Sequence, residues 1–308
     1  MQNELQTALF QAFDTLNLQR VKTFSVPPVT LCGPGSVSSC GQQAQTRGLK
    51  HLFVMADSFL HQAGMTAGLT RSLAVKGIAM TLWPCPVSGR KQVLAHASLM
   101  PDVAILDAAL TEGVPSHVTA MTGIDALTHA IEAYSALNAT PFTDSLAIGA
   151  IAMIGKSLPK AVGYGHDLAA RESMLLASCM AGMAFSSAGL GLCHAMAHQP
   201  GAALHIPHGL ANAMLLPTVM EFNRMVCRER FSQIGRALRT KKSDDRDAIN
   251  AVSELIAEVG IGKRLGDVGA TSAHYGAWAQ AAQEDICLRS NPRTASLEQI
   301  VGLYAAAQ

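Results

Sequence analysis

The sequence is poor in charged residues, in aromatic residues and in organised cysteines. Charged residues are 15% of the 308 residues, and aromatic residues are 5%. The formal net charge of +1 gives no electrostatic signal for nucleic acid or an anionic membrane surface. The seven cysteines are an odd number and form no C-x-x-C pair. We therefore expect reduced thiols, with no disulfide framework and no thiolate zinc site.

The sequence also lacks clear membrane or export signals. The N-terminus has neither the basic region nor the long apolar run of a secretion signal. The run from Ala177 to Ala197 is apolar, but it contains Ser186, Ser187 and His194 and is dominated by small residues. A pair of buried helices explains this run better than a membrane span does. We expect a cytoplasmic protein that binds neither nucleic acid nor a membrane.

What the sequence does contain is enough apolar residues for a large core. Hydrophobic residues are 49% of the chain, and the length suggests two domains. We predict an N-terminal amphipathic helix within residues 1–22, an incomplete α/β dinucleotide-binding-like domain over 23–117 and an all-helical metal-binding domain over 118–308.

The α/β part is predicted from alternating strands and helices. Short apolar runs at His51–Ala56, Ile78–Leu82 and Asp102–Leu106 are typical of buried strands. Helical patterns at Ser36–Arg47 and Ala63–Lys76 separate the first strands. This alternation predicts a parallel sheet.

No strand pattern follows residue 118, and helical periodicity continues to the end of the chain. The predicted helices are 119–136, 143–154, 168–185, 192–201, 211–226, 228–239, 245–259, 272–282 and 296–306.

Two segments of the helical part carry the candidate chemistry. Asp125 and His129 are four residues apart in a helix-forming run, so they share one helical face. His194 and His198 repeat this spacing, and His208 follows Pro207. Burying this many imidazoles in apolar sequence would be costly without a metal or a catalytic role. Asp125, His129, His194 and His208 form a mixed oxygen and nitrogen set that suits Fe²⁺ or Zn²⁺ better than Mg²⁺ or Ca²⁺.

These two segments resemble the signatures of the iron-dependent (group III) alcohol dehydrogenases, particularly the members that act in ethanolamine utilisation. The first signature matches at Asp107, Pro115, Ala120, Thr122, Asp125, His129 and Glu132. The resemblance implies the dehydroquinate synthase-like fold, with Asp125, His129, His194 and His208 as ligands of Fe²⁺ or Zn²⁺. It also implies NAD as cofactor, with His198 beside the nicotinamide ring. His198 is the predicted catalytic residue, which would contact the nicotinamide or relay the hydroxyl proton; a structural hydrogen bond is the alternative.

Asp57 closes the first predicted strand, where dinucleotide-binding sheets place an acid that binds the adenine ribose. In the resembling family, an aspartate at this place favours NAD, so Asp57 is a predicted cofactor-binding residue. The family's glycine-rich run that cradles the pyrophosphate is absent, and Val87 is followed directly by Ser88. A segment of roughly a fifth to a quarter of a family chain is missing at this junction, and with it the main anchor of a dinucleotide.

The leading hypothesis is an NAD-dependent dehydrogenase that interconverts acetaldehyde and ethanol in ethanolamine catabolism. Phe185 and Met183 are expected to line an apolar pocket, although core packing explains them equally well. The resemblance implies a homo-oligomer. The N-terminal helix is either an ordinary helix packed on the body or, within residues 1–20, a docking helix for a bacterial microcompartment shell or partner enzymes. The alternative is a catalytically inactive, metal-binding remnant that acts through protein contacts. A metal-dependent hydrolase would need Glu132 as its general base.

Overall fold

The computed structural model describes residues 24–85, 99–238 and 244–308. The predicted helix within residues 1–22 and the junction between Val87 and Ser88 lie outside the described residues. Contacts divide the chain into two compact units, which are described separately. The α/β unit is Val26–Thr119 with Ser157–Leu176, and the helical unit comprises the described residues of Met1–Ser25, Ala120–Lys156 and Ala177–Gln308. The three domains expected from the sequence stay a prediction.

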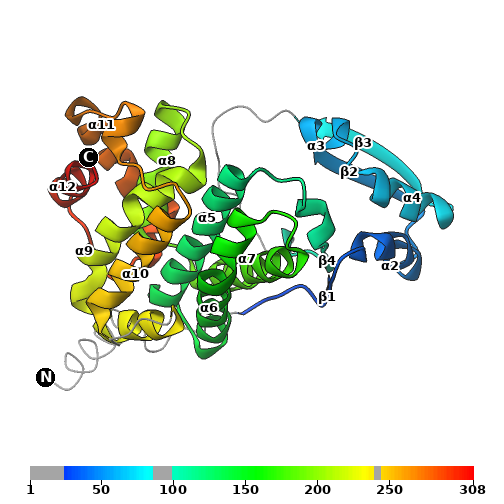
Figure 1. The fold of residues 1–308 in the computed structure, drawn as a ribbon, viewed down its shortest axis with the longest axis horizontal. Helices are drawn as coiled ribbons and strands as arrows, with labels where there is room; N and C mark the ends of the chain where they lie inside the picture. The colour runs from blue at the N-terminus through cyan, green and yellow to red at the C-terminus, as the bar shows by residue number, and fades with distance from the viewer. Residues whose placement is uncertain (1–23, 86–98, 239–243) are drawn as a thin grey trace, which may run out of the picture. The chain divides into compact units, whose positions relative to one another are not determined.

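The α/β unit contains the predicted parallel strands. Its elements are β1 (Val29–Cys32), η1 (Ser36–Ser39), α2 (Cys40–Thr46), β2 (His51–Asp57), α3 (Ser58–Gln62), α4 (Ala67–Val75), β3 (Ala79–Cys85), β4 (Val103–Leu106) and η3 (Ala108–Thr111). β2 pairs in parallel with β3 from His51 and Ala79, and β1 pairs in parallel with β4 from Val29 and Val103 (Figure 1). The described strands thus form two separate two-stranded sheets.

A buried aspartate closes one end of the sheet formed by β1 and β4. Asp107 follows β4 directly and is 4% exposed. Its carboxylate accepts hydrogen bonds from the backbone N–H groups of Gly35 at 2.8 Å and Val37 at 3.0 Å. Gly35 has a φ of +84°, which favours glycine. Asp107 therefore holds the Gly33–Gly35 turn against the carboxyl end of β4.

After β4 every described element is helical, as the sequence predicts. These elements are α5 (Ser116–Ser135), α6 (Pro141–Gly163), α7 (Leu168–Ala188), α8 (Leu192–Ala203), α9 (His208–Ala237), α10 (Asp245–Glu258), η4 (Leu265–Val268), α11 (Ser272–Glu284), η5 (Ile286–Ser290) and α12 (Leu297–Ala306). The two helices predicted over 211–226 and 228–239 are joined in α9, with non-helical dihedral angles at Cys227.

Two stretches are apolar enough to cross a membrane by length and composition alone: α6, and α7 with α8 if they are taken as one span bent by 108°. Core helices pass the same test. Ile151 and Ile154 of α6 are fully buried, and Asp144 in its first turn pairs with Arg230 at 2.9 Å. In α8, residues 192–197 are buried within the protein. The buried residues of α6 and α8 therefore pack within the protein.

A tyrosine from the last helix completes the hydrogen bonding of α8. Pro200 lies inside α8 and has no N–H, so the carbonyl of Met196 lacks its usual helical donor. The hydroxyl of Tyr304, from α12, donates to this carbonyl at 2.8 Å. Tyr304 is fully buried, and burial raises the pKa of its hydroxyl, which stays a donor. The contact fixes the middle of the helix that carries His194 and His198.

Replacing Tyr304 by Phe is expected to lower the free energy of unfolding by about 1–3 kcal/mol, because a buried carbonyl loses its donor. Urea denaturation measures this loss. Tyr164→Phe is the matched control, since Tyr164 is 64% exposed and its change should stay within about 0.5 kcal/mol.

The Pro200→Ala variant tests whether the loss comes from the unpaired Met196 carbonyl, because alanine restores an N–H that can donate to that carbonyl. Tyr304→Phe should cost less in that background than in the wild type. Equal losses in both backgrounds would contradict the explanation.

Candidate metal centre

Three helices supply the predicted metal-site residues. α5 carries Asp125 and His129 one turn apart. α8 carries His194 in its first turn, and α9 begins with His208 directly after Pro207. All four residues belong to the helical unit.

The four predicted ligands converge in space. Asp125, His129 and His194 each offer one ligand atom, and these atoms all lie within 4.8 Å of one another. His208 joins the group through its Nε2 atom, which lies 3.5 Å from Oδ1 of Asp125. The Nε2 atom of His194 lies 3.7 Å from the same oxygen. Two atoms bound to one ion at about 2.1 Å cannot be more than about 4.2 Å apart, so both distances fit a shared ion.

Ring contacts support the same arrangement. The rings of His129 and His194 stack with centroids 4.6 Å apart, and the centroids of His194 and His208 are 5.3 Å apart. His194 is 1% exposed, whereas Asp125 and His208 are each 20% exposed. The centre is therefore closed on the His194 side and reachable by solvent beside Asp125 and His208. One carboxylate and three imidazoles fit Fe²⁺ or Zn²⁺.

The neighbouring charges shift the pKa values of these groups in different directions. Burial acts to raise the pKa of Asp125, but the nearby imidazoles of His194, His129 and His208 outweigh it and hold that pKa well below its usual value. Burial and the charge of His194 lower the pKa of His129 to about 4. Burial acts to lower the pKa of His194, but Asp125 and Glu132 outweigh it and raise the value to about 9.

His198 lies beside this group, and its predicted role at the nicotinamide stays a prediction. Its Nδ1 atom lies 2.7 Å from Oδ2 of Asp285, and its ring stacks on His208 with centroids 5.3 Å apart. His198, Asp285 and Cys287 form a second group whose ligand atoms lie within 4.8 Å of one another. Burial and the charge of Asp285 raise the pKa of the Cys287 thiol, which opposes metal binding as a thiolate.

The other residues predicted for the site are placed as follows. The ring of Phe185 stacks on His129 with centroids 4.6 Å apart, so it lies beside the centre as expected. Met183 is half-buried in α7. Asp57 belongs to the α/β unit, where its Oδ1 atom accepts from the N–H groups of Phe59 and Leu60 at the start of α3.

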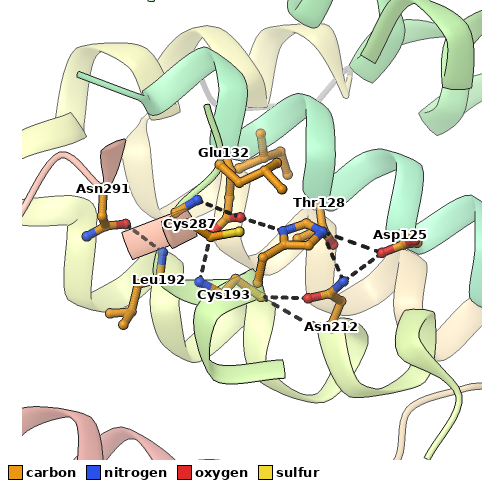
Figure 2. A network of polar contacts seen from close by, with 12 residues as sticks. Asp125, Thr128, Glu132, Leu192, Cys193, Asn212, Cys287 and Asn291 are labelled. Atoms are coloured by element: carbon orange, nitrogen blue, oxygen red, sulfur yellow. Dashed lines mark hydrogen bonds and ion pairs between the residues drawn. The ribbon is translucent and has the colours of Figure 1, made fainter. Parts of the chain in front are cut away.

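Asn212 is a site residue that the sequence reasoning missed. It is fully buried on α9, and Figure 2 shows it beside Asp125. Its Nδ2 atom donates to Oδ1 of Asp125 at 2.6 Å and lies 3.2 Å from Nε2 of His194. The available signal was its position four residues after His208, which places both side chains on one face of α9.

Metal affinity of the metal-free protein is expected to rise with pH between 6 and 8, by up to about tenfold per unit. The proton of His194, whose pKa is raised to about 9, must leave before Nε2 can bind an ion. His129, with its pKa lowered to about 4, is already neutral in this range. The affinity should level off above pH 9.

Calorimetry in buffers of different ionisation enthalpy measures the accompanying release of about one proton at pH 7. The folded metal-free protein should also lose the stabilising contribution of the charged His194, which is complete below pH 6.5, as pH rises through 9. Metal affinity that does not change between pH 6 and 8 would contradict the expected loss of a proton from His194 on metal binding.

Comparisons with known proteins place this centre in a family. Residues 119–308 match the sequence profile described as the Fe-containing alcohol dehydrogenase family, C-terminal. The chain is 78% identical over 395 residues to the probable alcohol dehydrogenase EutG of Escherichia coli and 68% identical over 394 residues to EutG of Salmonella typhimurium, with 100% of each chain covered. A crystal structure of 1,3-propanediol oxidoreductase matches with a TM-score of 0.86 and 28% identity, over 94% of this chain and 100% of that chain.

The alignment with the Escherichia coli protein also bears on the missing segment. It has 395 positions, and this chain has 308 residues, so 395 less 308 leaves at least 87 positions without a residue of this chain. That length agrees with the predicted absence of a fifth to a quarter of a family chain. The enzyme class and fold expected from the sequence are confirmed, and the chain belongs to the iron-containing alcohol dehydrogenase family.

Proposed function

We propose that this protein is an NAD-dependent, iron-containing alcohol dehydrogenase that interconverts acetaldehyde and ethanol in ethanolamine catabolism. The observation that carries the proposal is the convergence of Asp125, His129, His194 and His208 from three helices. These four residues are the proposed ligands of Fe²⁺, and Zn²⁺ fits the same set. The names of the two EutG relatives support the alcohol chemistry and suggest the pathway.

The proposed chemistry needs a Lewis acid and a hydride carrier. A bound Fe²⁺ or Zn²⁺ would lower the pKa of an alcohol hydroxyl, and a nicotinamide would exchange the hydride. Asp125 and His208, each 20% exposed, would bind the ion on the side open to solvent. The ring of Phe185 beside His129 gives this region an apolar surface, which favours a short aliphatic substrate over a sugar.

His198 would serve the proton and the cofactor rather than the ion. Asp285 holds its Nδ1 atom at 2.7 Å, which leaves Nε2 free to exchange a proton with the substrate hydroxyl or to contact the nicotinamide. His198 is 17% exposed, so a small molecule can reach its ring. Asp57 is the proposed acid for the adenine ribose.

Location and partners follow from the same proposal. A cytoplasmic protein, or one within a bacterial microcompartment, would meet short aldehydes produced in ethanolamine breakdown. Residues 1–20 are the proposed docking helix, and they lie outside the described residues. A homo-oligomer remains part of the proposal.

The decisive experiment is aldehyde-dependent oxidation of NADH by protein loaded anaerobically with Fe²⁺. His208→Gln is expected to lower the metal affinity by at least about 100-fold, because one of four ligands loses its imidazole, and to abolish turnover. His205→Asn is the matched control: His205 is exposed near the end of α8, and asparagine tolerates its φ of +54°. The control should keep both metal and activity.

Two outcomes would contradict the proposed dehydrogenase activity or its metal ligands. Wild-type protein that binds one metal per chain but shows neither NADH binding nor turnover would favour a metal-binding remnant acting through protein contacts. The Escherichia coli relative, which has the positions that this chain lacks, is the positive control for the assay. Wild-type protein without metal affinity would overturn the proposed ligand set itself.

A further inference from the structure

A buried carboxylate lies behind the candidate metal centre, on the side away from solvent. Glu132 of α5 is 6% exposed. Its Oε2 atom lies 2.6 Å from Nδ1 of His194 and accepts the backbone N–H of Gly191 at 3.0 Å. Its Oε1 atom accepts the backbone N–H of Cys193 at 2.7 Å. Figure 2 shows Glu132 next to Cys193 at the start of α8, with Asp125 and Asn212 on the opposite side of the network.

These contacts assign the protons on the ring of His194. A carboxylate only accepts hydrogen bonds, so the Nδ1 atom of His194 carries the hydrogen that it donates to Glu132. The Nε2 atom is then the one that faces Asp125, at 3.7 Å from Oδ1. A metal bound at this centre needs the lone pair of Nε2. Glu132 thus selects the tautomer that the centre requires.

The same carboxylate also fixes the position of α8. Helix N-termini leave backbone N–H groups without helical partners, and a buried carboxylate is a strong acceptor for them. Glu132 takes two of these groups, from Gly191 and Cys193, on either side of the first residue of α8. His194 follows at the next position. Rotation of the first turn of α8 would therefore break these bonds before His194 could turn away from Asp125.

We propose that Glu132 is the positioning residue of the metal centre, which holds the Nε2 atom of His194 toward the ion through both the imidazole ring and the start of α8. This inference rests on the metal ligands of the proposed function. It also argues against the hydrolase alternative, because Oε2 of Glu132 lies against Nδ1 of His194 and Oε1 accepts from the N–H of Cys193. A general base would have to face the open side of the ion.

Asn291 provides a matched control at the same end of α8. Its Oδ1 atom accepts the backbone N–H of Leu192 at 3.0 Å. It is 5% exposed, which is close to the value for Glu132, and its contacts in the network do not include His194. Asn291→Ser therefore weakens the start of α8 without touching the imidazole ring.

The test measures Zn²⁺ affinity by competition with a chelator, in wild type, Glu132→Gln and Asn291→Ser. The amide of glutamine has one acceptor and one donor group, so it cannot accept from all three partners of Glu132. When its NH₂ group faces His194, the ring hydrogen moves to Nε2 and blocks the metal. Glu132→Gln is expected to lower the affinity by about 10–100-fold, and Asn291→Ser by less than about threefold, although both lower the melting temperature.

Equal Zn²⁺ affinity in Glu132→Gln and the wild type would overturn this inference and leave the proposed function intact. Loss of affinity in Asn291→Ser as large as in Glu132→Gln would also overturn it, because the effect would then come from helix capping alone. Wild-type protein that binds no Zn²⁺ would instead contradict the proposed set of four metal ligands.

A measurement on the wild type decides the question if Glu132→Gln does not fold. Long-range ¹⁵N–¹H correlation spectra of Zn²⁺-loaded protein labelled at histidine report which ring nitrogen carries hydrogen. The expected spectrum shows His194 protonated at Nδ1 and bound to metal through Nε2. Metal bound through Nδ1 would contradict the role assigned to Glu132.

Discussion

The cost of burying ionisable groups constrains the packing around the candidate metal centre. An isolated charge in an apolar interior is costly, so each buried group needs a partner of opposite charge or a ligand. His194 is fully buried, yet its pKa is raised rather than lowered, because it lies between the carboxylates of Asp125 and Glu132. The helices α5 and α8 can pack at this point only while these three side chains satisfy one another.

Two glycines permit the close approach that this arrangement needs. A Cβ atom on Gly209 would lie 2.1 Å from the carbonyl oxygen of Met121, so only glycine lets the start of α9 meet α5. A Cβ atom on Gly191 would lie 2.8 Å from both Oε1 of Glu132 and Oδ1 of Asn291. The glycines and histidines that recur together in residues 189–209 thus have linked roles. The glycines let the helix backbones approach one another, and the histidine side chains lie between the helices.

Local pattern accounts for what the sequence predicted correctly. Helical periodicity found the long helices from α5 to α12, although the predicted α6 ends nine residues early and α9 was predicted as two helices. The spacing of Asp125 and His129 placed both on one face. The short α3 was missed because five residues, capped by Asp57, carry too little periodicity. The separation of the strands into two sheets was also not predicted, since pairing depends on contacts distant in sequence.

The four predicted ligands came from spacing and resemblance, whereas their partners came only from the structure. Asn212 and Asp285 are ordinary polar residues in the sequence, and each acquires its role from a contact with a residue 87 positions away. Glu132 stood in a recognised signature, yet its bonds to Gly191, Cys193 and His194 cross between helices. Sequence spacing shows which side chains share a face, and packing decides what that face meets.

The proposed metal and cofactor functions depend on different parts of the chain. All four proposed ligands and Glu132 lie within residues 119–308, the range that matches the family profile. The acid proposed for the ribose, Asp57, lies outside that range, and the sequence has no glycine-rich run for a diphosphate. Glycine-rich turns at helix N-termini supply much of the binding free energy of a dinucleotide, so we expect the missing run to affect NADH binding and not the metal ligands. Metal affinity and cofactor affinity should therefore vary independently in this protein.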